Sequence, residues 1–106
     1  MTAIASSIAR GDFLIGEEFK LYCVPQNPSD NAICVVYITG AVDSLTTVDL
    51  FSGKIKGAER VFCLRYDTGP EQLRDLTMKW IDWPETDLSF AATLIIWKAI
   101  KNAYSC

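Results

Sequence analysis

The sequence has 106 residues, of which 50% are hydrophobic and 22% charged, with a formal net charge of −3 at pH 7. This size and composition predict one globular domain, and the charge balance argues against a nucleic-acid binder or a DNA mimic. The chain has no histidine, which excludes Ser-His-Asp and Cys-His catalytic groups and removes the commonest metal ligand. We therefore expect neither an enzyme nor a bound cofactor.

The first residues lack the basic and apolar stretches of a signal peptide. We expect residues 1–11 to be a disordered N-terminal segment or residues left over from cloning, and residues 12–106 to form the domain. Asp12 can cap a first helix. The face of that helix predicted to be buried carries Ile15, Phe19, Tyr22 and Cys23.

The next segment supports two interpretations. Ser29 or Asp30 can cap a helix, whereas the β-branched run 33–39 favours a buried strand. The helical interpretation places on one face Cys34, Tyr37, Ile38, Ala41, Leu45 and Val48. In a helix, Gly40 would permit close approach of another helix, and Asp43 would act as a cap or hydrogen-bond acceptor. The pattern alone leaves all-α and α+β folds open.

Residues 50–60 contain two glycines and three basic residues, a composition that predicts a surface loop. Loops on rigid scaffolds often carry recognition. We predict that this segment binds a partner through Phe51, Lys54, Ile55, Lys56 and Arg60.

The C-terminal half has a helical pattern. Pro70 suits the first position of a helix, and one face of this helix carries Leu73, Leu76, Trp80 and Ile81. Pro84 ends it, and a second helix is expected from about Glu85 to Tyr104. The apolar stripe of the second helix contains Leu88, Ala91, Ala92, Ile95, Ala99 and Ala103. A short connection predicts that the two helices pack antiparallel.

The connection between these helices contains a second group of predicted partner-binding residues, Trp83 and Glu85. Asp82, Glu85 and Asp87 also surround Pro84 and include the carboxylate pair that glycoside hydrolysis needs. Carboxylates at a helix junction more often cap the next helix and favour its positive end. Capping is therefore the role we expect for them.

Four cysteines, Cys23, Cys34, Cys63 and Cys106, lie far apart with no Cys-x-x-Cys pair. An even number with this spacing predicts two disulfides rather than a metal or redox site. The sequence allows three pairings, and we expect the sequential one, Cys23–Cys34 and Cys63–Cys106. Disulfides indicate export, so we expect that an export signal was removed from this sequence.

Several segments, taken in order, resemble the Tai family of immunity proteins against type VI secretion amidases. The similar segments are Phe13-Leu14-x-Gly16 with Phe19 and Cys23; Cys34-x-x-Tyr37-Ile38-x-Gly40-x-x-Asp43; Phe62-Cys63; Thr68 with Gln72-Leu73; Trp80; and Ala92-x-Leu94 through Ala99 to Tyr104-x-Cys106. The resemblance implies an all-α bundle of about four main helices with two intramolecular disulfides.

The resemblance also implies a function. A Tai-like protein is periplasmic, is often a homodimer, and neutralises a cognate cell-wall amidase by blocking its active-site cleft. It needs no catalytic residue or cofactor and does not insert into the membrane. Two other readings stay open: a disulfide-bonded helical periplasmic chaperone or adaptor, and a cytosolic phage-type inhibitor with reduced cysteines.

Overall fold

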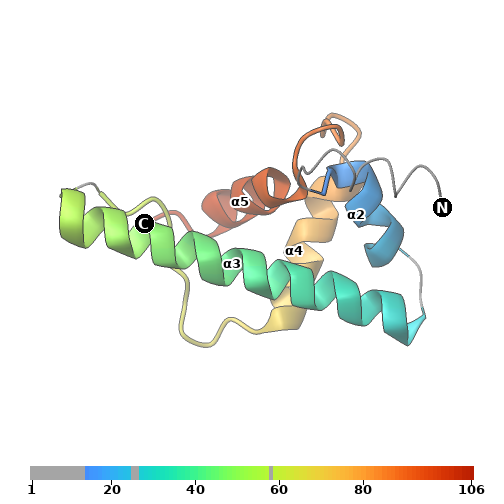
Figure 1. The fold of residues 1–106 in the computed structure, drawn as a ribbon, viewed down its shortest axis with the longest axis horizontal. Coiled ribbons are helices and arrows are strands. Elements are labelled where there is room, and N and C mark those ends of the chain that lie inside the picture. The colour runs from blue at the N-terminus through green and yellow to red at the C-terminus, as the bar shows by residue number, and fades with distance from the viewer. Residues whose placement is uncertain (1–13, 25–26, 58) are drawn as a thin grey trace.

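The computed structural model describes residues 14–24, 27–57 and 59–106, apart from the side chains of Ile55 and Lys56 (Figure 1). This part of the chain forms helices α2 (Gly16–Cys23), α3 (Pro28–Lys56), α4 (Pro70–Asp82) and α5 (Ala92–Ala103). The expected all-α fold is confirmed, since the described residues contain no strand beyond two isolated bridges. The segment 1–11 and the Asp12 cap lie outside the described residues.

α3 is the long central helix and includes the run 33–39, so the strand alternative is excluded. Its cap is Asn27 rather than Ser29 or Asp30: the Asn27 side chain accepts a 2.8 Å hydrogen bond from the Asp30 N–H, and Pro28 follows it. Tertiary packing overrides β propensity here, because one helical face is buried. The buried apolar residues of that face are Cys34, Ile38 and Val42.

The prediction of a loop at residues 50–60 is wrong for residues 50–56, because α3 continues through Lys56. Gly53 is tolerated inside the helix at a cost of about 1 kcal/mol. The helix ends at Gly57, whose φ of 73° is the left-handed C-terminal conformation that glycine adopts most easily. The connection to α4 therefore begins only after Gly57.

α4 confirms the predicted helix with proline in its first turn. The Gln72 side chain accepts a 2.8 Å hydrogen bond from the Gly69 N–H and so fixes the start of the helix. The buried residues of α4 are Leu73, Thr77 and Ile81. On the neighbouring face, the Arg74 guanidinium donates a 2.8 Å hydrogen bond to the Cys23 carbonyl at the end of α2.

α5 begins at Ala92 rather than near Glu85. Residues 83–91 form turns, and the first two N–H groups of α2 donate hydrogen bonds of 2.8 and 3.0 Å to the carbonyls of Phe90 and Leu88. These N–H groups have no partner inside α2. Long-range hydrogen bonds to α2 therefore hold this stretch out of the predicted helix.

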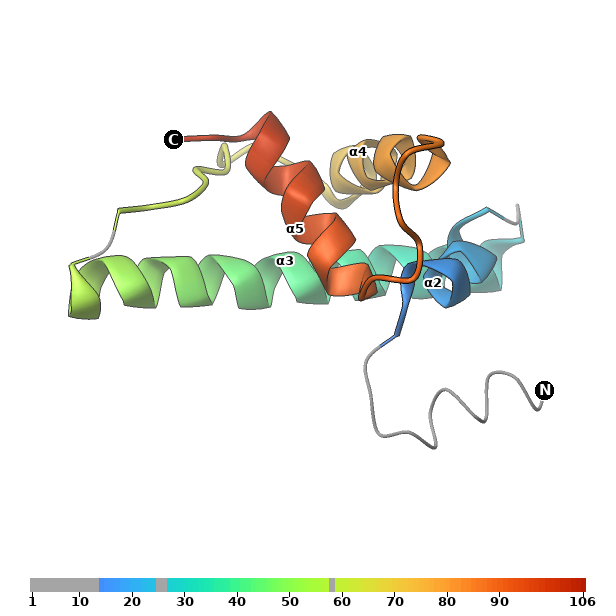
Figure 2. The same cartoon turned by 90° about the horizontal axis from the view of Figure 1, so that it is seen from above.

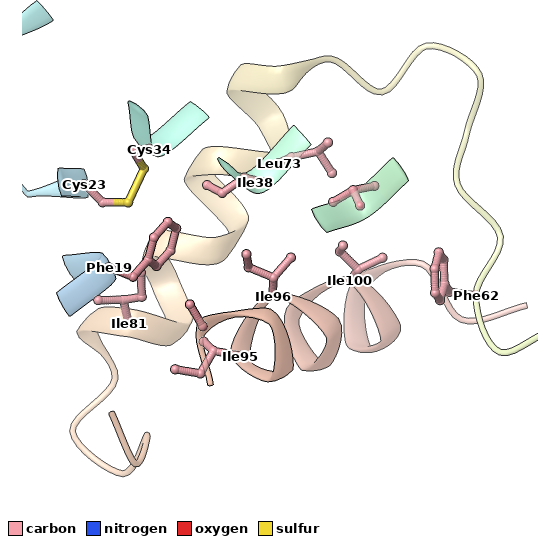
Figure 3. Close-up of a cluster of buried hydrophobic side chains, with 12 residues drawn as sticks. Phe19, Cys23, Cys34, Ile38, Phe62, Leu73, Ile81, Ile95, Ile96 and Ile100 are labelled. Carbon is pink, nitrogen blue, oxygen red and sulfur yellow. A yellow bond between two sulfur atoms is a disulfide. The ribbon is translucent and has the colours of Figure 1, made fainter. Parts of the chain in front are cut away.

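The longer connection changes how the two C-terminal helices pack. α4 lies across α5 instead of antiparallel to it (Figures 1 and 3). Both helices lie on the same side of α3 (Figure 2). The opposite side of α3 is therefore left without cover from them.

The hydrophobic core lies where all four helices meet (Figure 3). Its labelled side chains are Phe19, Cys23, Cys34, Ile38, Phe62, Leu73, Ile81, Ile95, Ile96 and Ile100. Gly16 permits the closest approach in this core, because an added Cβ would lie 2.6 Å from Ile95 Cδ1. Gly40 is exposed, and an added Cβ there would meet no atom within 4 Å, so its predicted role in packing within the chain is wrong.

The sequential disulfide pairing is confirmed. Cys23–Cys34 is buried and joins the end of α2 to the first turns of α3. Cys63–Cys106 is exposed and joins the connection before α4 to the C-terminus. Beside the second bridge, the Cys63 N–H donates a 2.7 Å hydrogen bond to the Tyr104 carbonyl.

Candidate functional site

The predicted partner-binding residues fall into two groups that the fold does not bring together. Phe51, Lys54 and Arg60 lie at or just after the C-terminal end of α3, whereas Trp83 and Glu85 lie in the connection between α4 and α5. The molecule is 45 Å long, and Figure 1 shows these two places toward opposite ends of it. One compact partner-binding surface that includes all of them is therefore not formed.

The C-terminal end of α3 carries exposed apolar and basic side chains at helical spacing. Val48, Phe51 and Lys54, here called the α3 tip, follow one another at intervals of three residues on one helical face. Phe51 is 56% exposed, although it is a large apolar residue. Figures 1 and 2 show this end of α3 projecting past α4 and α5. The tip is thus a protruding surface with an aromatic centre.

Arg60 is partly engaged inside the chain. Its Nε donates a 2.9 Å hydrogen bond to the buried carboxylate of Asp49, which also accepts from the Val61 N–H at 2.9 Å. Burial raises the pKa of Asp49, but the hydrogen bonds from Arg60 and from the backbone N–H groups of Val61 and Phe62 outweigh it, and the pKa lies below its ordinary value. Partner binding by Arg60 stays a prediction.

Asp49 has the acceptor role that the sequence suggested for Asp43. Asp43 is exposed, and it lines a shallow hollow of about 240 Å³ together with Arg65. The helical pattern predicts Val48 on the buried face, but in the structure Val48 is exposed and Asp49 is buried. A carboxylate in a buried position gives no apolar signal, so sequence periodicity missed it.

The connection between α4 and α5 forms the rim of a cavity of about 230 Å³, here called the aromatic pocket. Trp80 and Trp83 meet edge to face with their ring centroids 5.5 Å apart. The Lys98 ammonium lies 5.2 Å from the centre of the Phe90 ring. The residues that line the pocket are Trp80, Trp83, Glu85, Thr86, Asp87, Phe90, Ile95 and Lys98.

Asp87 caps a turn in this connection rather than the next helix. Its carboxylate accepts hydrogen bonds from the Ser89 hydroxyl at 2.6 Å and from the Ser89 N–H at 2.9 Å. These hydrogen bonds hold the pKa of Asp87 below its ordinary value. The predicted capping of the next helix is therefore wrong, because α5 begins at Ala92 and its cap residue, Ala91, makes no side-chain hydrogen bond.

The outer face of α3 is a further exposed surface, which we define by Ile33, Val36, Gly40 and Ser44. It carries no charge, and Val36 is 70% exposed. By length and composition alone, Pro28–Lys54 is apolar enough to cross a membrane, a test that core helices of soluble proteins also pass. Only 22% of its most apolar window is buried. The sequence indicates this surface through the high mean hydropathy of Pro28–Lys54, because a helix without a distinct polar face leaves apolar residues on its exposed side.

The family model of the Rap1a immunity proteins matches residues 15–106. The chain belongs to the Rap1a immunity family. The matched range includes both disulfides, the α3 tip, the outer face of α3 and the aromatic pocket. No curated protein and no solved structure matches the chain.

The Rap1a family is a type VI secretion immunity family. Membership makes the chain a type VI effector immunity protein, a class that binds a cognate effector. Together with the two disulfides, it indicates an extracytoplasmic protein. Within residues 14–24, 27–57 and 59–106, no group of three or more acidic or cysteine side chains is placed to hold a metal ion.

Proposed function

We propose that this Rap1a protein is a periplasmic inhibitor of a type VI cell-wall amidase and acts by covering the amidase active-site cleft. The observation that carries the proposal is the α3 tip, where Phe51 is 56% exposed on a helix that projects past its neighbours (Figure 2). A protruding convex element is the shape that a concave active site accepts. The amidase as target is supported by the resemblance to the Tai family.

The chemistry of the tip also suits protein binding. Interfaces concentrate their affinity in a few central aromatic side chains, and charged groups around them set orientation. Phe51 supplies the aromatic centre, while Val48 and Lys54 flank it on the same helical face. Arg60 Nε lies 2.9 Å from Asp49 Oδ2, and this ion pair holds the segment after α3 against the helix next to the tip. We place the main effector contact here.

The test is peptidoglycan cleavage by the amidase encoded beside this gene, with and without an equimolar amount of the protein. We expect stoichiometric inhibition by the wild type. The double variant F51A/K54A should bind the amidase at least about 30-fold more weakly, which corresponds to roughly 2 kcal/mol for loss of a central aromatic contact. The helical circular dichroism signal should not change, because Phe51 and Lys54 are exposed.

Tyr66→Ala is the matched control, since Tyr66 is a fully exposed aromatic residue outside α3. It should inhibit as well as the wild type. Equal affinity of F51A/K54A and the wild type would move the effector site away from the tip. An amidase that stays active and forms no complex with the wild type would refute the proposed target and favour a chaperone or adaptor.

We further propose that the protein is a homodimer in which a second copy covers the outer face of α3. Gly40 has open space above its Cα, so a helix of a second copy can approach there more closely than at any larger side chain. Val36→Glu should convert the dimer to a monomer in light-scattering measurements. The matched control Leu21→Glu changes another exposed apolar residue (58%), on α2, and should stay dimeric. A wild-type monomer would refute this part of the proposal.

A further inference from the structure

The aromatic pocket is lined in part by large aromatic side chains that are exposed to solvent instead of packed in the core. Trp83 is 49% exposed and Phe90 is also exposed, so two large rings face solvent beside a cavity of about 230 Å³. Exposed aromatic rings around a concave site are typical of binding surfaces. The pocket is smaller than the roughly 300–1,000 Å³ of sites for drug-sized ligands, so its volume suits a single side chain.

The pocket is also held in shape before any ligand arrives. Trp83 packs edge to face on Trp80, which belongs to α4. On the other side, the Phe90 carbonyl accepts a 2.8 Å hydrogen bond from the first N–H of α2. The Asp87 carboxylate stabilises the turn before Phe90 by accepting hydrogen bonds from the N–H and the hydroxyl of Ser89. A rigid pocket loses less conformational entropy on binding.

The charges that line the pocket favour a cation. Among the described residues around it, Glu85 and Asp87 are acidic and only Lys98 is basic, which leaves one negative charge unbalanced. The Lys98 ammonium already lies over the Phe90 ring at 5.2 Å and is attracted by Asp87. The cation of the chain itself, Lys98, is therefore engaged with Phe90 and Asp87. Among the described residues, neither the exposed Trp83 indole nor the Glu85 carboxylate has a cation in contact with it.

We propose that the aromatic pocket binds an arginine side chain of the protein partner. A guanidinium is planar, stacks on an indole ring and donates two parallel hydrogen bonds to a carboxylate, so Trp83 and Glu85 together match it better than they match an ammonium. The inference rests on the proposed function, because it adds a second contact for the effector far from the α3 tip. Its test uses no effector, so the two can fail separately.

The probe is N-acetyl-arginine methylamide, and its neutral analogue N-acetyl-citrulline methylamide is the control ligand. Both are titrated into the ¹⁵N-labelled protein while the tryptophan indole N–H signals are followed by NMR. We expect saturable shifts of the Trp80 and Trp83 signals with the arginine probe at millimolar concentration, and a response to citrulline at least about fivefold weaker, because the charge is lost. The Trp97 signal reports non-specific binding, since Trp97 does not line the pocket.

Two variants should change the affinity in opposite directions. Glu85→Gln removes the carboxylate and should weaken binding at least about threefold, whereas Lys98→Met removes the competing cation and should tighten it by a similar factor. The dispersion of each spectrum shows whether the variant is folded.

Absence of a saturable shift, an equal response to citrulline, or weaker binding by Lys98→Met would overturn the inference. If the amidase were still inhibited in that case, the proposed function would stand without it. Saturable arginine binding by a chain that inhibits no amidase would support the pocket and refute the target.

Discussion

Gly16 and Gly40 show how the same residue type has opposite roles in two helices. A Cβ added at Gly16 would lie 2.6 Å from Ile95 Cδ1 and 2.9 Å from the Leu88 carbonyl oxygen, and the backbone atom cannot move without breaking its hydrogen bond to α2. A Cβ added at Gly40 would meet open space. Only the first glycine is therefore needed for packing within the chain.

We predict that Gly16→Ala lowers the free energy of unfolding by about 1–3 kcal/mol through overpacking. Gly40→Ala should raise it by up to about 1 kcal/mol, because alanine favours the helix. Urea unfolding followed by circular dichroism, at a concentration where the chain is monomeric, measures both. A neutral Gly16→Ala variant would mean that α2 can move away from the 83–91 connection.

Asp49 links stability to pH. Its pKa is lower in the folded protein than the ordinary 3.8, so its stabilising contribution is complete above that value and is lost as pH falls through the folded pKa. Asp49→Asn should lower the free energy of unfolding by about 1–3 kcal/mol at neutral pH, because it breaks a charged hydrogen bond to Arg60.

The difference in the free energy of unfolding between Asp49→Asn and the wild type should shrink as pH falls below about 4, because the carboxylate of the unfolded chain takes up its proton first. Denaturant unfolding across this range measures it. Asp43→Asn is the control, since Asp43 is exposed on the same helix. A constant difference down to acidic pH would show that the Asp49 charge does not stabilise the fold.

At the scale of the elements, helix positions could be predicted better than helix ends. The core positions Cys34 and Ile38 of α3 followed from their spacing, but both ends of the helix depend on single residues, Asn27 and Gly57. α5 is shorter than predicted, because the carbonyls of Leu88 and Phe90 bond to α2, about 70 residues earlier in the chain. A local pattern contains no information about such a partner.

The two parts of α3 should also differ in their local stability. α3 packs against α2, α4 and α5, and its buried apolar residues are Cys34, Ile38 and Val42, whereas residues 50–56 project past the core (Figure 1). We predict that amide hydrogens in residues 52–56 exchange faster than those in residues 36–45, because local opening there exposes little buried surface. Hydrogen exchange with mass spectrometry tests this. Equal protection along the whole helix would contradict it.

At the scale of the whole molecule, the expected sequential disulfide pairing and the all-α class implied by the family resemblance are confirmed, but the arrangement of the binding surfaces could not be predicted. Composition identified Phe51 and Trp83 as candidate contacts, because aromatic residues beside charged ones are recognisable in any sequence. The direction in which α4 crosses α5 sets how far apart these two residues lie along the 45 Å molecule. The same crossing forms the aromatic pocket. Crossing directions are set by side-chain packing, which periodicity does not specify.

The two disulfides should respond differently to reductant, since Cys23–Cys34 is buried and Cys63–Cys106 is exposed. With a limited amount of dithiothreitol, we expect the first alkylated thiols at Cys63 and Cys106, because thiolate attack needs access to sulfur. Peptide mass spectrometry identifies the sites. On the chain-entropy argument, losing this bridge costs about 4 kcal/mol. First alkylation at Cys23 and Cys34 would show that local opening, rather than exposure, controls reduction.

The Cys63–Cys106 bridge also makes a covalent ring that contains α4 and α5. A protease that cuts within this ring, for example after the exposed Arg65, leaves the two pieces joined until the bridge is reduced. The Cys23–Cys34 bridge protects the junction of α2 and α3 in the same way. The stretch between residues 34 and 63 belongs to neither ring, so a single cut there separates the two disulfide-closed halves of the chain.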